Sequence, residues 1–128
     1  MNALTAEWVS KAEGDYATAG RELRVDDRPN FDAVCFHAQQ TAEKYLKALL
    51  QENQVRFPKT HSLIELLELC LPLDESLENL RSDLIRLGRY AVHYRYPGEA
   101  ASKLEAQMAY EVVTSVRQAL RAKLKTAN

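Results

Sequence analysis

The sequence predicts an all-α fold, an antiparallel (up-down) four-helix bundle with a short fifth helix in a connection. The first observation is that apolar residues recur at spacings of three and four along four long segments, as on the buried face of a helix. The second is that no segment alternates apolar and polar residues in the way that is typical of a strand. With 128 residues, the chain is expected to form a single domain over 1–128 with a hydrophobic core.

The first two helices are expected over 5–23 and 31–53. A loop of turn residues over 26–30 separates them, and Asn30 at its end is a candidate cap for the second helix. The expected apolar face of the first helix comprises Trp8, Ala12, Tyr16, Ala19 and Leu23. The expected apolar face of the second comprises Phe31, Cys35, Ala38, Ala42, Tyr45, Leu46 and Leu49.

Start signals mark the other three helices. The segment Ser62–Glu65 has the spacing of a capping box and opens a short third helix. Asp74 is expected to cap a fourth helix over 75–95, in which Gly88 lies near the core and allows a close helix crossing. The last helix is expected over 99–124. Expected apolar stripes are Leu77, Leu80, Leu84, Leu87 and Ala91 on the fourth helix, and Ala101, Leu104, Met108, Val112, Val116 and Ala119 on the last.

The composition excludes several classes of protein. No apolar run is long enough to span a membrane, and the N-terminus has no signal segment, so we expect a cytoplasmic protein. Cys35 and Cys70 each have apolar neighbours, which favours reduced thiols in the core over a disulfide or a metal site. Neither a glycine-rich phosphate loop nor a cluster of metal ligands occurs, so no cofactor and no metal are expected. With a net charge of −1, anion binding requires a local patch, and 81–95 supplies one with four arginines against one aspartate.

One candidate site is a polar stripe on the second helix, opposite its apolar face. Gln40, Thr41, Lys44 and Gln51 all fall within about 60° of His37 on a helical wheel. His37, Gln40 and Lys44 can donate hydrogen bonds to an anion or a nucleotide. The alternative, which the sequence leaves open, is a polar face exposed to water or to a second subunit.

The other candidate site is the end of the fourth helix. Arg86, Arg89, Tyr90 and His93 fall on one face of that helix, opposite its leucine stripe. A guanidinium holds a phosphate in a fork, and an imidazole that titrates near neutrality can accept or donate a proton. This combination suits the cleavage of RNA phosphodiesters. The alternative is a solvated basic face on a surface helix.

Three further side chains are expected at the point where the fourth helix stops. Pro97–Gly98 ends the helix, because proline lacks an amide donor and disfavours helix in the residue before it. Tyr94, Arg95 and Tyr96 therefore lie at a helix end, where their side chains can reach a ligand.

Four segments together resemble a known family. They are the Trp8–Asp15 pattern, Cys35–Leu50, Pro58–Leu67 and Arg89–Gly98. In this order and spacing they resemble the HEPN domain (higher eukaryotes and prokaryotes nucleotide-binding domain) over nearly the whole chain. The resemblance implies a helical bundle that commonly forms a homodimer. It also implies, for many prokaryotic members, a partner protein that is a small nucleotidyltransferase encoded nearby.

The resemblance also suggests an activity. In several such pairs the HEPN protein is a ribonuclease toxin and the nucleotidyltransferase is its antitoxin. Toxic members carry an arginine, a few variable residues and then a histidine, and two copies of this motif meet across the dimer. Here six residues separate Arg86 from His93, which identifies these two as the candidate catalytic pair.

Two functions therefore follow as hypotheses. In the first, the protein is a metal-independent endoribonuclease in which Arg86 holds the scissile phosphate, His93 transfers a proton, and Arg89 and Arg95 stabilise charge in the transition state. In the second, it is a non-catalytic partner of a small nucleotidyltransferase that binds a nucleotide or RNA. The binding residues would then be His37, Gln40, Lys44, Arg86, Arg89, Tyr94, Arg95 and Tyr96.

Overall fold

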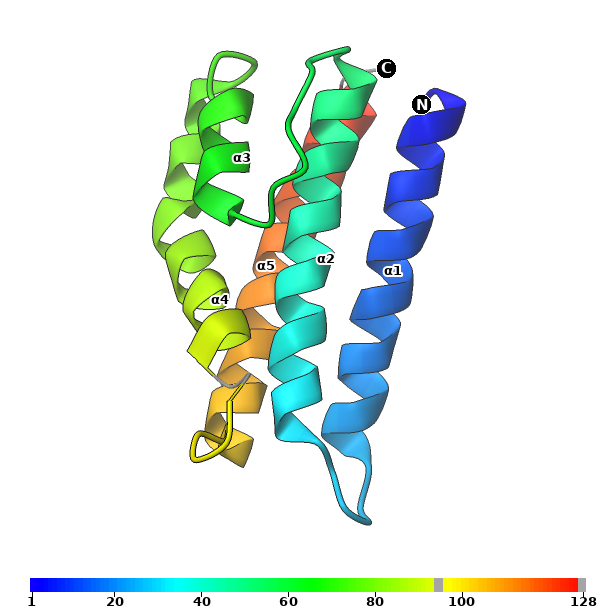
Figure 1. The fold of residues 1–128 in the computed structure, drawn as a ribbon. Coiled ribbons are helices and arrows are strands. Elements are labelled where there is room, and N and C mark those ends of the chain that lie inside the picture. Colours follow the sequence, from blue (N-terminus) through cyan, green and yellow to red (C-terminus); the bar gives the residue numbers. More distant parts are fainter. Residues whose placement is uncertain (94–95, 127–128) are drawn as a thin grey trace.

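Five α-helices and one 3-10 helix build the protein in a computed structural model that describes residues 1–93 and 96–126 (Figure 1). No strand occurs in this part of the chain, which confirms the all-α prediction. The elements are α1 (Ala3–Arg24), α2 (Phe31–Glu52), α3 (Leu63–Cys70), η1 (Glu75–Leu80), α4 (Arg81–His93) and α5 (Lys103–Thr126).

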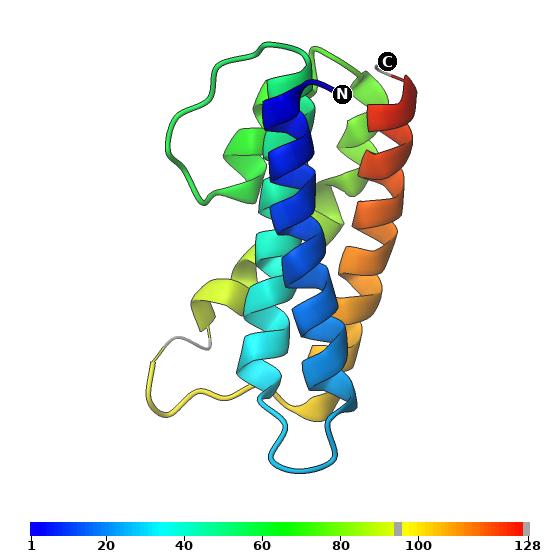
Figure 2. The same ribbon diagram turned by 90° about the vertical axis from the view of Figure 1, so that its right-hand side faces the viewer.

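The four long helices run alternately along the bundle, and both chain ends lie at the same end of it (Figure 1). Helix α2 occupies the centre, since it packs against α1, α3, α4 and α5, whereas α1 and α4 do not form a comparable interface with each other. Figure 2 shows that the connection between α2 and α3 runs outside the helices before the chain turns back into α3. None of the described helices is both long and apolar enough to cross a membrane.

The central position of α2 explains its burial. Every residue of the segment 45–50 is buried, including Lys47, so this part of the helix is enclosed on all sides. The expected apolar face of α2 lies in the core, with Phe31 half-buried at its start. The stripe expected on α1 also packs against the core.

Side-chain caps define where several helices begin. Asn30 Oδ1 accepts a hydrogen bond from Ala33 N at 3.0 Å, as predicted. Ser62 Oγ accepts from Glu65 N at 3.2 Å, as its capping-box spacing predicts. The start of α1 differs from the prediction, because Asn2 accepts from the backbone N–H of residue 5 and moves the first helical residue to position 3.

The expected single helix over 75–95 is two elements. After Asp74, whose carboxylate accepts from Ser76 N at 3.0 Å, the chain forms the 3-10 helix η1 and only then α4, which ends at residue 93. In a 3-10 helix, residues three apart lie on the same face. This winding directs both Leu77 and Leu80 into the core, so the leucine stripe is preserved although the helix type changes.

The last helix begins later than predicted and faces the core with another stripe. A capping box sets its start, because Ser102 Oγ accepts from Glu105 N at 3.1 Å and Glu105 Oε1 accepts from Ser102 N at 3.0 Å. Leu104 is 65% exposed and Met108 is 36% exposed, so the predicted stripe is wrong over this half of the helix. Ala101 and Val116 of the predicted stripe are buried, and Val112 and Ala119 pack partly against the core. The buried residues that the prediction did not include are Ala106, Ala109, Val113, Leu120 and Leu124.

The close helix crossing expected at Gly88 is also absent. A Cβ at Gly88 would meet nothing within 4 Å, so this glycine is not required for packing. The close approach lies at Gly20 instead, where a Cβ would come within 3.0 Å of the hydroxyl of Tyr110. The ring of Tyr110 stacks on Tyr16 at a centroid distance of 5.1 Å and fixes how closely α1 and α5 approach.

Candidate functional site

Helix α4 presents two arginines on its outer face. Leu84 and Leu87 are fully buried against the core, whereas Arg86 and Arg89 are exposed. Neither guanidinium pairs with a carboxylate in the part of the chain that the structure describes. Unpaired, exposed guanidinium groups are suited to holding a phosphate, because no internal anion competes for their donors.

The third described member of the predicted face lies differently. Tyr90 is half-buried and packs against the core, so it does not share the fully exposed face of Arg86 and Arg89. Burial raises the pKa of its hydroxyl, and the nearby charge of Arg86 acts in the opposite direction. Tyr90 thus anchors the end of α4 beside the arginines.

The remaining predicted residues at this end are only partly described. His93 is the last residue of α4, but its side chain lies outside the described residues, as do Tyr94 and Arg95. Tyr96 is exposed in the turn that follows, where Gly98 adopts a φ of +92°. A positive φ is readily adopted by glycine, so Gly98 suits the turn that leads into α5.

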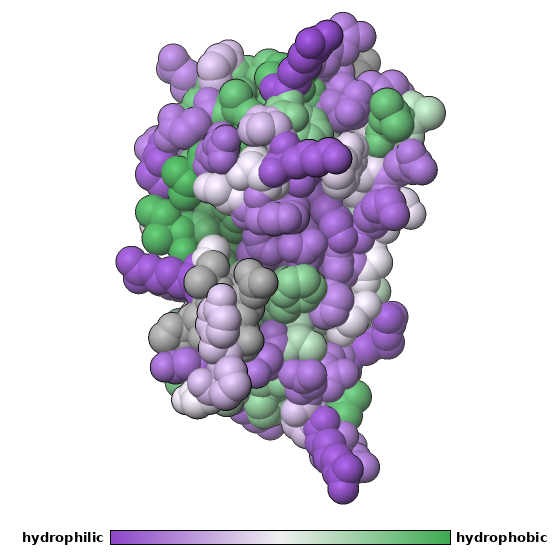
Figure 3. Space-filling model, viewed as in Figure 1, coloured by the Kyte–Doolittle hydropathy of each residue, from purple (hydrophilic) through white to green (hydrophobic). Residues whose placement is uncertain are grey.

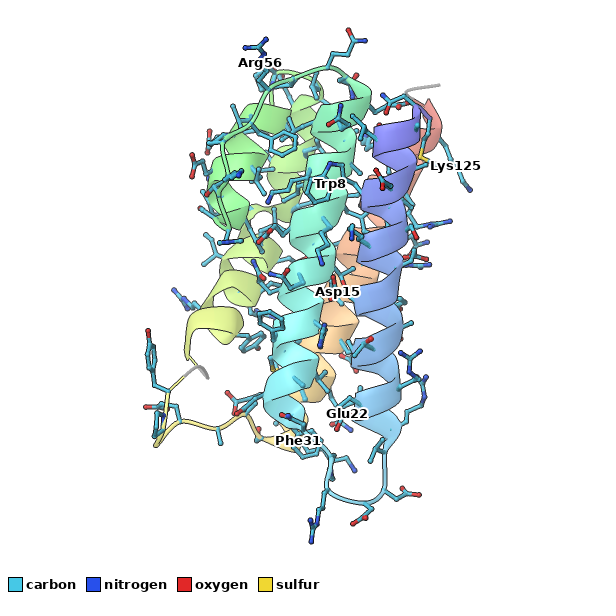
Figure 4. The ribbon with its side chains drawn as sticks, turned by 45° about the vertical axis from the view of Figure 1, so that its right-hand side comes forward. Trp8, Asp15, Glu22, Phe31, Arg56 and Lys125 are labelled. Carbon is cyan, nitrogen blue, oxygen red and sulfur yellow. The ribbon has the colours of Figure 1, made fainter. Side chains whose placement is uncertain are left out.

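The polar stripe predicted on α2 is divided by one carboxylate of α1. Asp15 Oδ1 lies 2.7 Å from His37 Nδ1, and Asp15 Oδ2 accepts from Lys44 Nζ at 2.5 Å. The Asp15 side chain is largely buried and sits between α1 and α2 (Figure 4). His37 and Lys44 are therefore engaged in holding two helices together, whereas Gln40 lies on a different surface.

That surface is a groove of about 640 Å³ between α2, the start of α3, and α4. Figure 3 shows apolar surface on this side of the bundle, over α3 and α4. Phe36 is 46% exposed and Ile85 is 40% exposed, so an aromatic and an aliphatic side chain lie open to a ligand. The lining residues are Phe36, Gln39, Gln40, His61, Ser62, Leu63, Ile64, Leu84, Ile85 and Gly88.

A buried polar network forms the floor behind this groove. The carboxylate of Glu43, whose side chain is 3% exposed, accepts hydrogen bonds from Lys47 Nζ at 3.0 Å and from Gln39 Nε2 at 3.3 Å. His61 Nδ1 lies 3.2 Å from the same carboxylate, and the backbone oxygen of His61 accepts from Gln39 Nε2 at 3.2 Å. Gln40 Nε2 in turn donates to Gln39 Oε1 at 2.8 Å. The network ties the start of α3 to α2.

Gln39 and Glu43 were not among the site residues predicted from the sequence. The signal available was spacing, because 39, 43 and 47 follow one another at four-residue intervals, where polar side chains on a helix interact. That signal was hidden, since a charged pair at this spacing ordinarily lies on an exposed face. Only the enclosure of α2 shows that these charges are buried.

The two cysteines do not contribute a nucleophile. Both are buried and free, as predicted, and burial raises the pKa of the Cys35 thiol and of the Cys70 thiol to about 12. A thiol of that pKa holds its proton at neutral pH and is unreactive. Among the described residues no group of three metal-ligating side chains comes together.

Comparisons with known proteins agree with this architecture. The model of the HEPN domain family matches residues 5–123. The crystal structure of TT1696 from Thermus thermophilus is similar, with a TM-score of 0.73 and 30% sequence identity over 93% of this chain and 97% of that chain. The crystal structure of ST0689, an archaeal HEPN homologue, has a TM-score of 0.69 and 20% identity over 93% and 96% of the two chains. Among curated proteins none matches at a significant level.

The sequence segments that resembled this family lie within residues 5–123, the region that the family model matches. They lie on α1, on the central helix α2, around the cap at Ser62, and on the arginine-bearing α4 and the turn after it. The match spans most of the chain, which confirms the resemblance, and the chain belongs to the HEPN domain family.

Proposed function

We propose that this protein is a metal-independent endoribonuclease of the cytoplasm, acting as the toxin of a toxin–antitoxin pair. Arg86 holds the scissile phosphate through its guanidinium. His93 takes a proton from the ribose hydroxyl or gives one to the leaving oxygen. Arg89 and Arg95 stabilise the charge that develops on the phosphorus oxygens.

The observation that carries this proposal is the state of the two described arginines. Arg86 and Arg89 are exposed on one helix, and neither has a carboxylate partner in the described part of the chain. By contrast, Arg81 at the start of α4 is held by Glu68 and Glu78, and Arg117 on α5 by Glu13. On α4, the arginines near the helix end are therefore available for an external phosphate, whereas Arg81 is not.

The family supports two partners as part of the same proposal. A homodimer would bring two α4 ends together, so that the exposed arginines of both chains contribute to one site. A small nucleotidyltransferase encoded nearby would act as the antitoxin. Neither partner has to alter the fold described above, because the arginines are already exposed.

The groove favours a second candidate, a non-catalytic module that binds a nucleotide for a nucleotidyltransferase partner. The exposed side chains of Phe36 and Ile85, beside the amide of Gln40, suit a nucleobase. The exposed arginines of α4 supply positive charge nearby. Two sequence features also favour this candidate. Leu87 follows Arg86 where ribonuclease members often have a polar residue, and two residues separate His93 from Tyr96 where the best-known toxic members have one residue between histidine and tyrosine.

The test uses a structured RNA in the presence of a chelator. The variants are Arg86→Ala, Arg89→Ala and His93→Ala, with Arg56→Ala as the matched control. Arg56 is an exposed arginine in the connection after α2, at the end of the bundle away from the end of α4 (Figure 4). Each variant is assayed for cleavage and for binding as a function of salt concentration.

The ribonuclease proposal predicts that His93→Ala abolishes cleavage but retains RNA binding. It predicts that Arg86→Ala weakens binding and reduces the slope of log K against log salt concentration by about 0.7, the value for one phosphate contact with a single strand. The Arg56→Ala control should match the parent protein. Cleavage by His93→Ala at the parent rate would refute the mechanism, and binding without turnover in the parent would favour the second candidate.

A further inference from the structure

We propose that the groove between α2, α3 and α4 holds a nucleobase, with Gln40 reading its edge and adenine as the preferred base. The inference deepens the proposed function and rests on it for its biological use. Its physical basis is separate, because it depends on the direction in which a chain of hydrogen bonds is polarised. That chain begins at a buried carboxylate and ends at the groove.

The carboxylate of Glu43 fixes the orientation of Gln39. A carboxylate only accepts hydrogen bonds, so the atom of Gln39 that faces it must be the amide nitrogen. The same nitrogen also donates to the backbone oxygen of His61, which is likewise only an acceptor. Both hydrogens of the Gln39 amide are thereby used, and its oxygen is left as the acceptor.

The orientation of Gln39 then fixes that of Gln40. Because Gln39 presents an oxygen, the Gln40 atom 2.8 Å from it must be the nitrogen that donates to it. Gln40 retains its own oxygen and one N–H for a ligand. Gln39 is buried and cannot reorient without leaving the Glu43 carboxylate short of a donor. The buried carboxylate of Glu43 thus determines which hydrogen-bonding groups Gln40 presents to the groove.

The same reasoning assigns the imidazole of His61. Its Nδ1 faces the Glu43 carboxylate at 3.2 Å and therefore carries the hydrogen, so in the neutral ring Nε2 is an acceptor. His61 lines the groove, and its side chain is 85% exposed. It adds a second acceptor to the polar wall.

An amide with one donor and one acceptor fits adenine. The amino group at N6 donates, and the ring nitrogen N7 or N1 beside it accepts, so either edge of adenine complements the amide. Guanine presents two acceptors, O6 and N7, on the corresponding major-groove edge. Guanine can complement the same amide only through its other edge, with O6 as acceptor and N1–H as donor. The preference for adenine therefore applies to a base that enters by its major-groove edge, which is the orientation we propose.

The apolar lining supplies the rest of a base site. Phe36 lies one helical turn before Gln40 on the same face of α2, and its ring is about half-exposed. Bases stack on exposed aromatic rings in this way in single-stranded nucleic-acid sites. On the opposite wall Arg89 follows Ile85 by one turn of α4, which puts a guanidinium on the same face for the phosphate attached to the base.

The experiment uses nucleosides that lack a phosphate, so that the arginines do not contribute. Adenosine and guanosine are titrated into the full-length protein, and their Kd values are obtained from chemical-shift changes. The variants are Gln40→Ala and Gln40→Glu, and the matched control is Gln118→Ala, a change at an exposed glutamine of α5. Circular dichroism establishes that each variant is folded.

Adenosine should bind the parent protein and the Gln118→Ala control more tightly than guanosine. Gln40→Ala should raise the adenosine Kd about 5- to 100-fold, the range for losing one well-placed contact to a base. Gln40→Glu offers two acceptors and no donor, which suits the N1–H and N2–H groups of guanine, so the ratio of the two Kd values should shift towards guanosine.

Either of two results would overturn the inference. One is the absence of adenosine binding by the parent protein, and the other is an unchanged ratio of Kd values in both Gln40 variants. The outcomes are separable from those of the ribonuclease test. RNA cleavage without adenosine binding would support the proposed function and contradict the base site. Adenosine binding without RNA cleavage would support the base site and contradict the ribonuclease function.

Discussion

Replacing Lys47 with methionine should destabilise the fold by about 3 to 4 kcal/mol. The Lys47 side chain is 8% exposed and its ammonium lies 3.0 Å from the carboxylate of Glu43, which is 3% exposed. Removing one partner of a buried ion pair costs about 3 to 5 kcal/mol, because the other charge stays buried without compensation. We place this cost near the lower end of that range, since Gln39 and His61 still donate to the carboxylate. The lost contact of the ammonium with the Trp8 ring, 5.4 Å from its centroid, adds about 0.5 to 1 kcal/mol.

A double-mutant cycle separates the ion pair from the loss of packing. Glu43→Gln alone should cost a similar amount, because it leaves the ammonium of Lys47 buried without an anion. The double variant removes both charges and should cost no more than about 2 kcal/mol, which gives a coupling energy of about 4 kcal/mol or more. Urea unfolding measures each free energy of unfolding. Circular dichroism reports the helices, and the fluorescence of Trp8, the one tryptophan of the sequence, reports the site.

The control is Lys11→Met on the exposed side of α1, which should change the free energy of unfolding by less than about 0.5 kcal/mol. Two results would contradict the reasoning. A Lys47→Met variant within about 1 kcal/mol of the parent protein would show that the carboxylate is not effectively buried. If the double variant lost as much free energy of unfolding as Lys47→Met and Glu43→Gln together, the two charges would not interact.

Three further predictions follow from contacts elsewhere. Glu13→Gln should lower the free energy of unfolding by about 1 to 2 kcal/mol at neutral pH. The Glu13 side chain is 33% exposed, and Arg117 donates two hydrogen bonds to its carboxylate, at 2.6 and 2.7 Å, which lower the pKa of Glu13. A lowered pKa stabilises the fold above the unfolded value near 4.3, so urea titrations should show the difference fading as the pH falls below about 4. Gly14→Ala should stabilise the protein by about 0.5 to 1 kcal/mol, because the added Cβ meets nothing within 4 Å. Gly20→Ala should give no such gain, because its Cβ would lie 3.0 Å from the hydroxyl of Tyr110. Thermal unfolding measures both variants. Both cysteine thiols, with a pKa of about 12, should stay unmodified by a thiol reagent at a pH of about 8 until urea unfolds the chain.

Local signals gave reliable predictions where the cause itself is local. The caps at Asn30 and at Ser62 depend on side chains that reach backbone N–H groups three residues away, so their spacing is visible in the chain. The capping box at Ser102 has the same form, and it places the start of α5 after the residue 99 that was predicted.

The candidate site was predictable in part. The exposure of Arg86 and Arg89 follows from their position opposite a leucine stripe. The division of the polar stripe on α2 does not follow, because it depends on Asp15, which lies on another helix. A helical wheel places side chains around their own axis and carries no information about which neighbour faces them.

The sequence by itself determined the helical class, most of the caps and the family, since each of these is encoded in spacing along one segment. Tertiary structure decided which of two apolar stripes on α5 enters the core, and it selected the one with Ala106 and Ala109 over the one with Leu104 and Met108. It also decided that Lys47 and Glu43 are buried and that Gln40 lines a groove. The physical reason is common to all three. Burial and hydrogen-bond partnership are properties of the packed surfaces of several helices, and they exist only once α2 is enclosed by its neighbours.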